Sequence, residues 1–315
     1  WQPRWPGSPR TAKMRPLSSV VVQPDPVIPA VVRVSTSPNF PRPWVAVVGG
    51  LHGNEPCGLR AIERIRDEAE RGAFPLKRGT VVLVHGNPEA TRHNLRFTVG
   101  GADLNRLFDF EFESRLRREQ WSYEHERAIA LRPVFESVDA AIDIHSATEP
   151  TPAFVITTSI PQSPELGRAI GLRHVTRGWE DLNILSGKVF LALLTKRGKP
   201  SIAVECGQHE QAEAKQTAYK AATRFLIAQD LLEGDLVTQT EVQVLDVIRA
   251  LRKPSPDFRF THPFKGLELL TKGTEIGSDG DIAVSVSEDR YALLPNDRVP
   301  VGIDMLYLAK PVAGI

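Results

Sequence analysis

The sequence predicts an α/β protein with a mostly parallel or mixed sheet flanked by helices, followed by a smaller, β-rich C-terminal domain. Short runs rich in valine and isoleucine alternate with helix-like segments up to about residue 235. Beyond that point, short β-like runs separated by turn signals replace the alternation. Strands that alternate with helices are typical of a parallel sheet covered on both faces. We therefore expect a main domain over 18–235 and a β-rich domain over 236–315.

The expected elements of the main domain follow one another in a regular order. A strand over 43–50 ends at two glycines, and a helix begins near Pro56, a residue suited to a first helical turn. Apolar residues recur on one face of this helix, and Gly72 favours its end. Further strands are expected at 80–85, 139–145, 153–158 and 201–206, and further helices at 121–136, 163–170 and 209–232.

Composition excludes several classes of protein. Of the 315 residues, 24% are charged and 41% belong to the hydrophobic set, which excludes a disordered chain, a coiled coil and a collagen. Lys and Arg number 39 against 38 for Asp and Glu, so the net charge is +1. This balance argues against broad capture of nucleic acid or of an anionic membrane. No apolar run approaches the ~18 residues that a membrane span needs.

The cysteines and the first residues bear on where the protein works. Cys57 and Cys206 are the only cysteines, so the chain has no disulfide framework. That count suits a reducing compartment, and we expect a cytoplasmic protein. Residues 1–17 are rich in proline and basic side chains without the apolar run of a secretory signal, which predicts a flexible leader. The sequence is compatible with a homo-oligomer.

Metal-ligating residues follow two of the expected strands. His52 and Glu55 come directly after the strand at 43–50, and His145 closes the strand at 139–145. An H-x-x-E pair with a third ligand about ninety residues later is typical of catalytic zinc, which keeps its fourth position for water. Each residue alone is weak evidence. Together, at strand ends where open α/β sheets bind ligands, they predict one zinc ion per chain.

Other residues complete a candidate site. Glu205 ends the strand at 201–206, where a carboxylate could take a proton from zinc-bound water. Arg106 beside Asn105 offers a fork of donors that matches a carboxylate, and Arg96 lies upstream. Before any resemblance is considered, this pattern favours a zinc hydrolase.

The remaining histidines and Cys206 are interpreted as structural. Cys206 and His209 could suggest a thiol nucleophile with its base, but catalytic Cys–His pairs usually come from distant segments. A small buried cysteine is the better interpretation. The histidines without partner spacing are expected to be surface or structural residues, namely His85, His93, His125, His174, His209 and His262.

Taken together, the motifs resemble the succinylglutamate desuccinylase/aspartoacylase family, part of the wider group of zinc carboxypeptidase-like hydrolases. The resemblance covers roughly residues 40–312. The matching segments are GGLHGNE (49–55), HGNPEA (85–90), RF (96–97), ADLNR (102–106), DIHS (143–146), VECG (204–207) and, more weakly, PFKGLELLTKG (263–273), SDG (278–280) and LLPNDRVPVG (293–302).

The resemblance implies a role for each matching residue. Glu205 matches the general base, and Arg96 matches the arginine that polarises the scissile carbonyl. Asn105 and Arg106 match the pair that grips a substrate carboxylate. The zinc ligands of the family fall on His52, Glu55 and His145. The resemblance also implies a carboxypeptidase-like core followed by a small β domain.

Two departures from the family pattern bear on the substrate. The spacer between Arg96 and Asn105 contains Gly100-Gly101 and is longer than usual. Aspartoacylases carry a further arginine upstream of the base, and Thr195 stands near that position in this chain. The second departure argues against N-acetylaspartate as the substrate, and the PNDRVPVG segment is nearer to the desuccinylase branch.

The sequence thus predicts zinc-dependent hydrolysis of the amide bond of a small N-acyl amino acid, of desuccinylase or deacylase type. A glutamate, Glu205, would activate the zinc-bound water. Three alternatives stay open on the residues alone. A metallocarboxypeptidase or an esterase could use the same site, and a non-catalytic binding protein could retain the fold.

Overall fold

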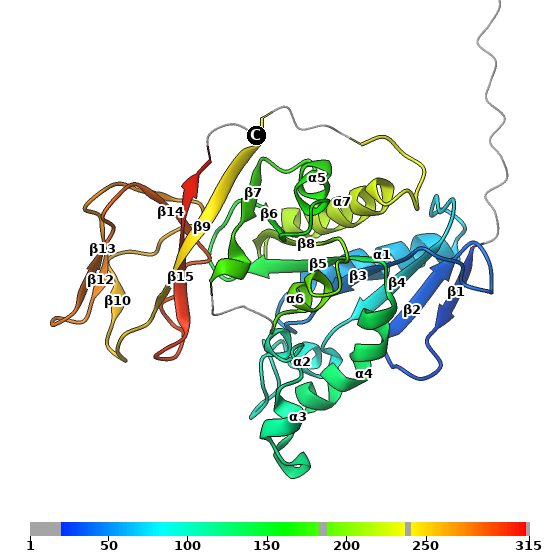
Figure 1. Cartoon of the computed structure of the whole chain (residues 1–315), viewed down its shortest axis with the longest axis horizontal. Helices are drawn as coiled ribbons and strands as arrows, with labels where there is room; N and C mark the ends of the chain where they lie inside the picture. Colours follow the sequence, from blue (N-terminus) through cyan, green and yellow to red (C-terminus); the bar gives the residue numbers. More distant parts are fainter. Residues whose placement is uncertain (1–19, 183–187, 237–240, 313–315) are drawn as a thin grey trace, which may run out of the picture.

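The computed structural model describes residues 20–182, 188–236 and 241–312, and shows a large mixed sheet flanked by helices (Figure 1). Its first strands are β1 (Val21–Pro24), β2 (Val31–Ser35), β3 (Trp44–Gly49), β4 (Thr80–His85), β5 (Ala140–Ala147), β6 (Phe154–Thr157), β7 (His174–Arg177) and β8 (Ser201–Gln208). The C-terminal strands are β9 (Gln243–Arg252), β10 (Arg259–Phe260), β11 (Leu269–Leu270), β12 (Glu275–Ser278), β13 (Ala283–Ser285), β14 (Arg290–Leu293) and β15 (Asp304–Pro311).

Most of the strands of the first part are connected through helices. The α-helices are α1 (Pro56–Glu70), α2 (Pro88–Arg92), α3 (Phe112–Arg115), α4 (Tyr123–Ser137), α5 (Ser163–Ala169), α6 (Phe190–Thr195) and α7 (Ala212–Ala228). Short 3-10 helices are η1 (Leu104–Arg106), η2 (Arg118–Gln120) and η3 (Trp179–Asp181). Among the residues that the structure describes, none of these helices combines the length and the apolar character that crossing a bilayer requires.

The large sheet has 12 strands in the order β1-β2-β4-β3-β5-β8-β6-β7-β9-β15-β14-β11. β4, β3, β5 and β8 are parallel neighbours, so these four strands end at the same edge of the sheet. β9 pairs in parallel with β7, and the C-terminal strands therefore continue the main sheet. β10, β12 and β13 form a separate three-stranded sheet. The mixed α/β architecture with a C-terminal antiparallel region confirms the predicted fold class.

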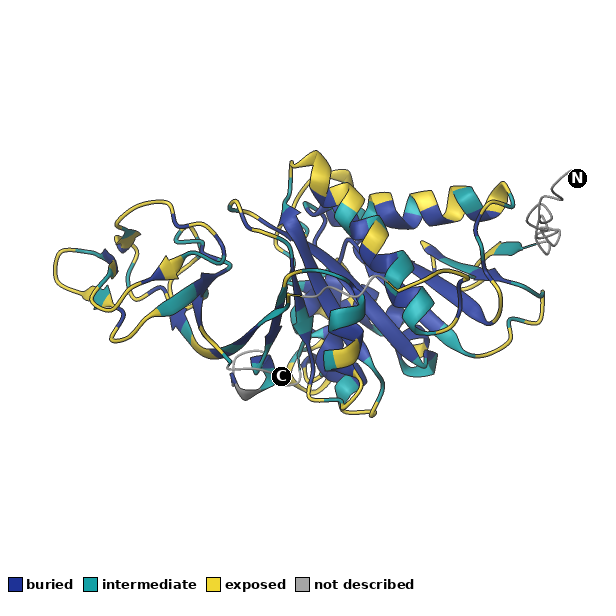
Figure 2. Ribbon diagram, turned by 90° about the horizontal axis from the view of Figure 1, so that it is seen from above, coloured by how far each residue is buried: buried dark blue, intermediate teal, exposed yellow. Residues whose placement is uncertain are grey.

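Apolar side chains cover both faces of the central strands. In β3, Val45 and Val47 pack into a cluster with residues of α1 and α7. Ala46 and Val48, which alternate with them, pack into a second cluster with residues of α4 and α6. Figure 2 shows the buried strands between helices whose outer faces are exposed. A near-continuous apolar run is therefore what this strand needs, because both of its faces are covered.

The C-terminal strands have a core of their own and share a second one with the main part. Phe258, Phe264 and Ile276 belong to a cluster made entirely of C-terminal residues. A further cluster joins Trp179 to Tyr307 of β15, with ring centroids 5.0 Å apart. The C-terminal strands are thus packed against the main part rather than merely tethered to it.

Each strand expected in the main domain is present, whereas the helix expected over 209–232 is shorter than predicted. It spans Ala212–Ala228, because a turn occupies the residues before it: the Glu210 N–H donates to the Gln208 side chain, 3.0 Å away. At the other end, Asp230 adopts a positive φ of 61°, which a helix cannot continue through. The expected leader at 1–17 lies outside the described residues.

Gly53 lies where the loop after β3 is pressed against α2. A Cβ built at Gly53 would lie 2.3 Å from the Ala90 carbonyl carbon and 2.3 Å from the Thr91 nitrogen, both backbone atoms. The Gly53 N–H also donates to the Arg96 carbonyl, at 3.2 Å. Only glycine fits here, because a side chain would force either the loop after β3 or the backbone of α2 to move.

We therefore expect Gly53→Ala to lower the free energy of unfolding by about 3 kcal/mol, the upper end of the usual cost of overpacking. Equilibrium unfolding in urea measures the change. A variant as stable as the parent would contradict this, since it would mean that the loop and α2 separate without cost.

Candidate active site

His52, Glu55 and His145 come together at the carboxyl ends of β3 and β5. One ligand atom from each residue lies within 4.8 Å of the others, and all three side chains are buried. The Glu55 carboxylate lies between the two imidazoles: Oε1 is 2.7 Å from His52 Nδ1, and Oε2 is 2.8 Å from His145 Nδ1. The three residues predicted to bind one ion are therefore neighbours in the fold.

The local structure explains why they meet. β3 and β5 are parallel with Val48 opposite Asp143, so both strands reach the same edge together. The tight turn after β3 is closed by the Glu55 N–H, which donates to the His52 carbonyl at 3.2 Å. Pro56 then starts α1 directly, as its fixed φ favours. His52 and Glu55 are thus held on one short, rigid turn.

A carboxylate contacts the remote nitrogen of each imidazole. His145 Nε2 is 2.7 Å from Asp143 Oδ2, and His52 Nε2 is 3.1 Å from Asp103 Oδ1. Burial lowers the pKa of His145, but the Asp143 and Glu55 carboxylates outweigh it and hold that pKa well above the usual value. Carboxylates in this position orient a metal-binding imidazole and increase its basicity. In both residues Nδ1 is left directed toward the shared Glu55.

Glu205 lies on β8 directly opposite His145 in the parallel register. Its side chain is buried, and its Oε2 atom has no hydrogen-bond partner among the described residues. Burial raises the pKa of Glu205 to about 7. A carboxyl group with this pKa can exchange a proton near neutral pH, as a general base must.

This donor set fits a zinc ion. Two imidazoles and one carboxylate are the ligands of several catalytic zinc sites, which keep the fourth position for water. A buried carboxylate oxygen without a partner, such as Oε2 of Glu205, is costly unless a further group satisfies it. A metal site with its bound water would supply such a partner.

Arg96 is held beside the metal-ligating residues by Asp103. Its Nε and Nη2 atoms lie 3.1 Å and 2.8 Å from Asp103 Oδ2. Its Nη1 lies 3.8 Å from Glu55 Oε1, and 44% of the side chain is exposed. The structure therefore places a cation next to the candidate zinc ligands, with part of its surface open to a substrate.

Asn105 and Arg106 lie on η1, directly after Asp103. The Asn105 Oδ1 accepts the Phe190 N–H at 2.8 Å, and its Nδ2 lies 3.4 Å from His145 Nε2. The half-buried Arg106 donates to the carbonyl of Asn105 at 2.8 Å. Asn105 is thus already hydrogen-bonded within the protein, whereas Arg106 has further N–H groups that the bond to Asn105 does not use.

Ser146 and His209 also lie at the site, although His209 was expected to be a surface or structural residue. The Ser146 Oγ is 2.8 Å from His209 Nδ1, and the Ser146 N–H donates to Glu55 Oε2 at 3.2 Å. His209 is half-buried. The available signal was its position just past the end of the strand that carries Glu205.

Cys206 is buried, as predicted, and does not pair with His209. Burial and the neighbouring Cys57 thiol raise the pKa of Cys206 well above its usual value. Because the thiolate is the nucleophilic form, this thiol is a poor nucleophile.

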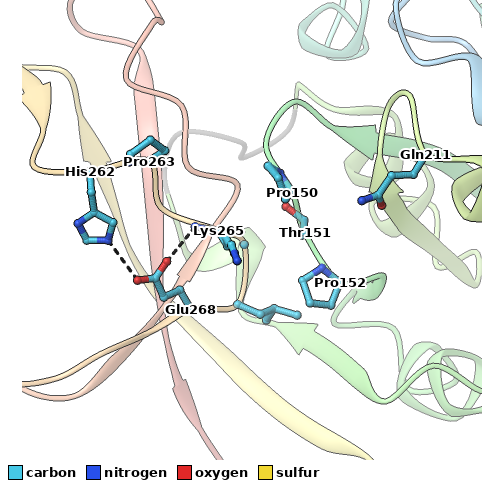
Figure 3. A pocket seen from close by; sticks show the side chains of 10 residues that line it. Pro150, Thr151, Pro152, Gln211, His262, Pro263, Lys265 and Glu268 are labelled. Atoms are coloured by element: carbon cyan, nitrogen blue, oxygen red, sulfur yellow. Dashed lines mark hydrogen bonds and ion pairs between the residues drawn. The ribbon is translucent and has the colours of Figure 1, made fainter.

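A groove of about 740 Å³ opens between the loop after β5 and the C-terminal strands (Figure 3). Three prolines and several polar side chains line it, and Lys265 extends from the C-terminal segment toward Pro150 and Pro152. The segments that supply Thr151 and Gln211 to the groove continue directly from those that carry His145 and Glu205. The C-terminal region therefore forms one side of the groove. The residues on the other side come shortly after the candidate site residues in the sequence.

Comparison with known proteins agrees with this geometry. The family model described as "Succinylglutamate desuccinylase/Aspartoacylase catalytic domain" matches residues 41–229, more than half of the chain. A succinylglutamate desuccinylase of Vibrio vulnificus is 24% identical over 281 residues, which cover 82% of this chain and 78% of the relative. An N-acyl-aromatic-L-amino acid amidohydrolase (carboxylate-forming) of Rattus norvegicus is 32% identical over 129 residues, only 38% of either chain.

Solved structures show the same fold. The crystal structure of succinylglutamate desuccinylase from Vibrio cholerae superposes with a TM-score of 0.72 at 18% identity, covering 90% of this chain and 85% of that one. At this identity the likeness concerns the fold alone. The match of the catalytic-domain model carries the assignment further: the chain belongs to the succinylglutamate desuccinylase/aspartoacylase family.

Proposed function

We propose that this chain is a zinc-dependent amidohydrolase that cleaves the linear amide of a small N-acyl amino acid. The observation that carries the proposal is the buried His52–Glu55–His145 set, beside Glu205 on the neighbouring strand, whose Oε2 has no hydrogen-bond partner in the described part of the chain. Family membership supports the reaction class, because relatives of this chain include desuccinylases and an N-acyl amino acid amidohydrolase.

In the proposed reaction each residue has one task. His52, Glu55 and His145 would hold one zinc ion. When bound, zinc supplies a Lewis acid and lowers the pKa of water toward ~7. Glu205 accepts a proton from the attacking water and returns it to the leaving nitrogen. Arg96 stabilises the negative charge that develops on the carbonyl oxygen.

Amine release from a panel of N-acyl amino acids by the zinc-loaded protein tests the proposal. The panel contains N-succinyl-glutamate, N-succinyl-arginine, N-acetyl-aspartate and N-acetyl-phenylalanine, together with a dipeptide and an ester. We expect release from at least one N-acyl amino acid in preference to the dipeptide and the ester. No release from any of the four, with zinc content verified, would contradict the proposal, and preferred cleavage of the dipeptide or ester would replace it.

We expect Arg106→Ala to raise KM for substrates with a free carboxylate by about 10- to 100-fold, the usual worth of a charge-assisted hydrogen bond. kcat should change little, because the bond is made in both the ground state and the transition state. Steady-state kinetics on an N-acyl amino acid and on its carboxamide separate the two effects. Arg115→Ala, which removes an exposed arginine of α3, is the control. An equal change for both substrates would argue against carboxylate binding by Arg106.

Two further proposals concern the whole chain. We propose a cytoplasmic location, which the two free, buried thiols of Cys57 and Cys206 support. We also propose a division near residue 236 into a catalytic and a β-rich domain. The cluster formed only by C-terminal residues supports that division.

A further inference from the structure

Glu124 is a completely buried carboxylate in the first turn of α4, outside the candidate zinc site. Its Oε1 accepts hydrogen bonds from the Thr98 N–H at 2.7 Å and from Asn87 Nδ2 at 3.2 Å. Its Oε2 accepts from Thr98 Oγ1 at 3.0 Å, the Ala102 N–H at 3.2 Å and Ser122 Oγ at 2.9 Å. Five donors thus converge on one carboxylate, and three of them come from residues 98–102.

Residues 98–102 form a tight turn around this carboxylate. The Gly101 N–H donates to the Thr98 carbonyl at 2.8 Å. A Cβ built at Gly101 would lie 2.3 Å from Glu124 Oε2, so only glycine permits so close an approach. The turn includes the Gly100-Gly101 pair of the spacer between Arg96 and Asn105. The carboxylate therefore fixes the middle of the loop between Arg96 and Asn105.

Glu124 carries its charge in this setting. Burial alone would raise its pKa, but the N–H of Thr98 and the amide of Asn87 outweigh burial and lower the pKa below its usual value. The hydrogen bonds are therefore charge-assisted, which makes them about twice as strong as neutral ones. A neutral side chain of the same shape cannot replace them.

Capping of α4 does not account for this arrangement. At the start of the helix, the Ser122 N–H donates to His125 Nδ1 at 3.0 Å, so another side chain satisfies that group. Of the five donors to Glu124, only Ser122 Oγ belongs to the segment leading into α4. The others come from Asn87, before α2, and from the loop at 98–102. The carboxylate serves the loop rather than its own helix.

The two ends of this loop carry the groups proposed to contact substrate. Arg96 precedes the turn, and Asn105 and Arg106 follow it. Asp103 directly follows Ala102, and its carboxylate lies within hydrogen-bonding distance of both Arg96 and His52. A shift of the turn would therefore displace Arg96, Asn105 and Arg106 together.

We propose that Glu124 is the positioning residue that fixes the 96–106 loop and thereby the carboxylate selectivity of the site. The proposal rests on the roles of Arg96, Asn105 and Arg106 in the proposed function. Glu124 does not touch substrate or metal; it acts through the Thr98–Ala102 turn.

Glu124→Gln tests the proposal. The glutamine side chain has the same shape, but its NH₂ group is itself a donor and cannot accept hydrogen bonds from the surrounding N–H and O–H groups. In hydrogen-exchange experiments we expect faster exchange across 98–106, including the Thr98 and Ala102 amides. In kinetics with saturating zinc we expect KM for an N-acyl amino acid to rise about tenfold, the equivalent of one lost charge-assisted bond. KM for the matching carboxamide should stay the same. A displaced Arg96 or a loss of folded protein would lower kcat for both substrates alike, so the ratio of the two KM values is the readout of carboxylate selectivity.

Glu126→Gln is the matched control, since Glu126 lies two residues along the same helix, is exposed and pairs with Arg118 at 2.7 Å. Unchanged exchange across 98–106 in Glu124→Gln would overturn the proposal. Faster exchange with an unchanged ratio of the two KM values would also overturn it. The exchange measurement needs no substrate. If no panel member is hydrolysed, the proposed function fails separately, and exchange alone decides whether Glu124 fixes the loop.

Discussion

Glu205→Gln is expected to lower kcat by about 10⁴-fold, the upper range for loss of a general acid–base group. Glutamine has the same shape as glutamate but cannot accept a proton. In the structure Glu205 faces His145 across the β5–β8 ladder, and its pKa of about 7 suits proton transfer near neutral pH. Because the candidate zinc ligands are three other residues, the variant should still bind one zinc ion per chain.

The measurement is single-substrate kinetics on zinc-loaded protein, with zinc quantified in the same sample. Glu210→Gln provides the control, because Glu210 is an exposed carboxylate just beyond the same strand and should be dispensable. A Glu205→Gln variant with full zinc and parental kcat would refute the assignment of the base. A variant that loses zinc instead would identify Glu205 as a further ligand.

The candidate site could be predicted from sequence because its main residues sit at the ends of recognisable strands. The parallel neighbours β3, β5 and β8 each present a residue at one edge, so His52, His145 and Glu205 become neighbours without any long-range information beyond strand adjacency. Glu55 needs only the tight turn after β3. The spacing of the motif residues, together with the adjacency of the strands, therefore predicts almost all of the arrangement of the candidate site.

The supporting contacts could not be predicted in the same way. Glu124 and Thr98 are 26 residues apart, and Ser146 and His209 are 63 apart, and no periodic pattern links either pair. Asp143 was visible two residues before His145, on the same face of the strand, but its contact with the imidazole depends on the ring orientation. Such contacts arise from packing between segments, which a single sequence does not encode locally.

Several short elements were missed for local reasons. β1 and β2 lie among prolines and are only four and five residues long. Five of the six residues of α6 (FLALLT) are buried, and it therefore lacks the polar face that marks a helix in sequence. The pairing of β7 with β9 joins the two predicted domains into one sheet, and no motif announces it.

Zinc should stabilise the protein against heat, and Glu55→Ala should abolish that effect. A ligand that binds only the folded state at about 1,000 times its Kd adds ~4 kcal/mol to the free energy of unfolding. For a chain of this size we expect Tm to rise by about 6 °C. Glu55 contacts both imidazoles, at 2.7 Å and 2.8 Å, and its removal takes away one ligand and the group that holds the other two.

Thermal unfolding of metal-free protein, with and without added zinc, measures the shift without reference to any substrate. Glu70→Ala, at the far, exposed end of the helix that begins directly after Glu55, should keep the full shift. An equal zinc shift in Glu55→Ala and in the parent would place the metal elsewhere in the chain. Loss of the shift in Glu55→Ala alone would tie zinc to the turn after β3, because Glu70 lies at the far end of α1, away from the imidazoles. The thermal test therefore separates metal binding from turnover, which the Glu205→Gln variant addresses independently.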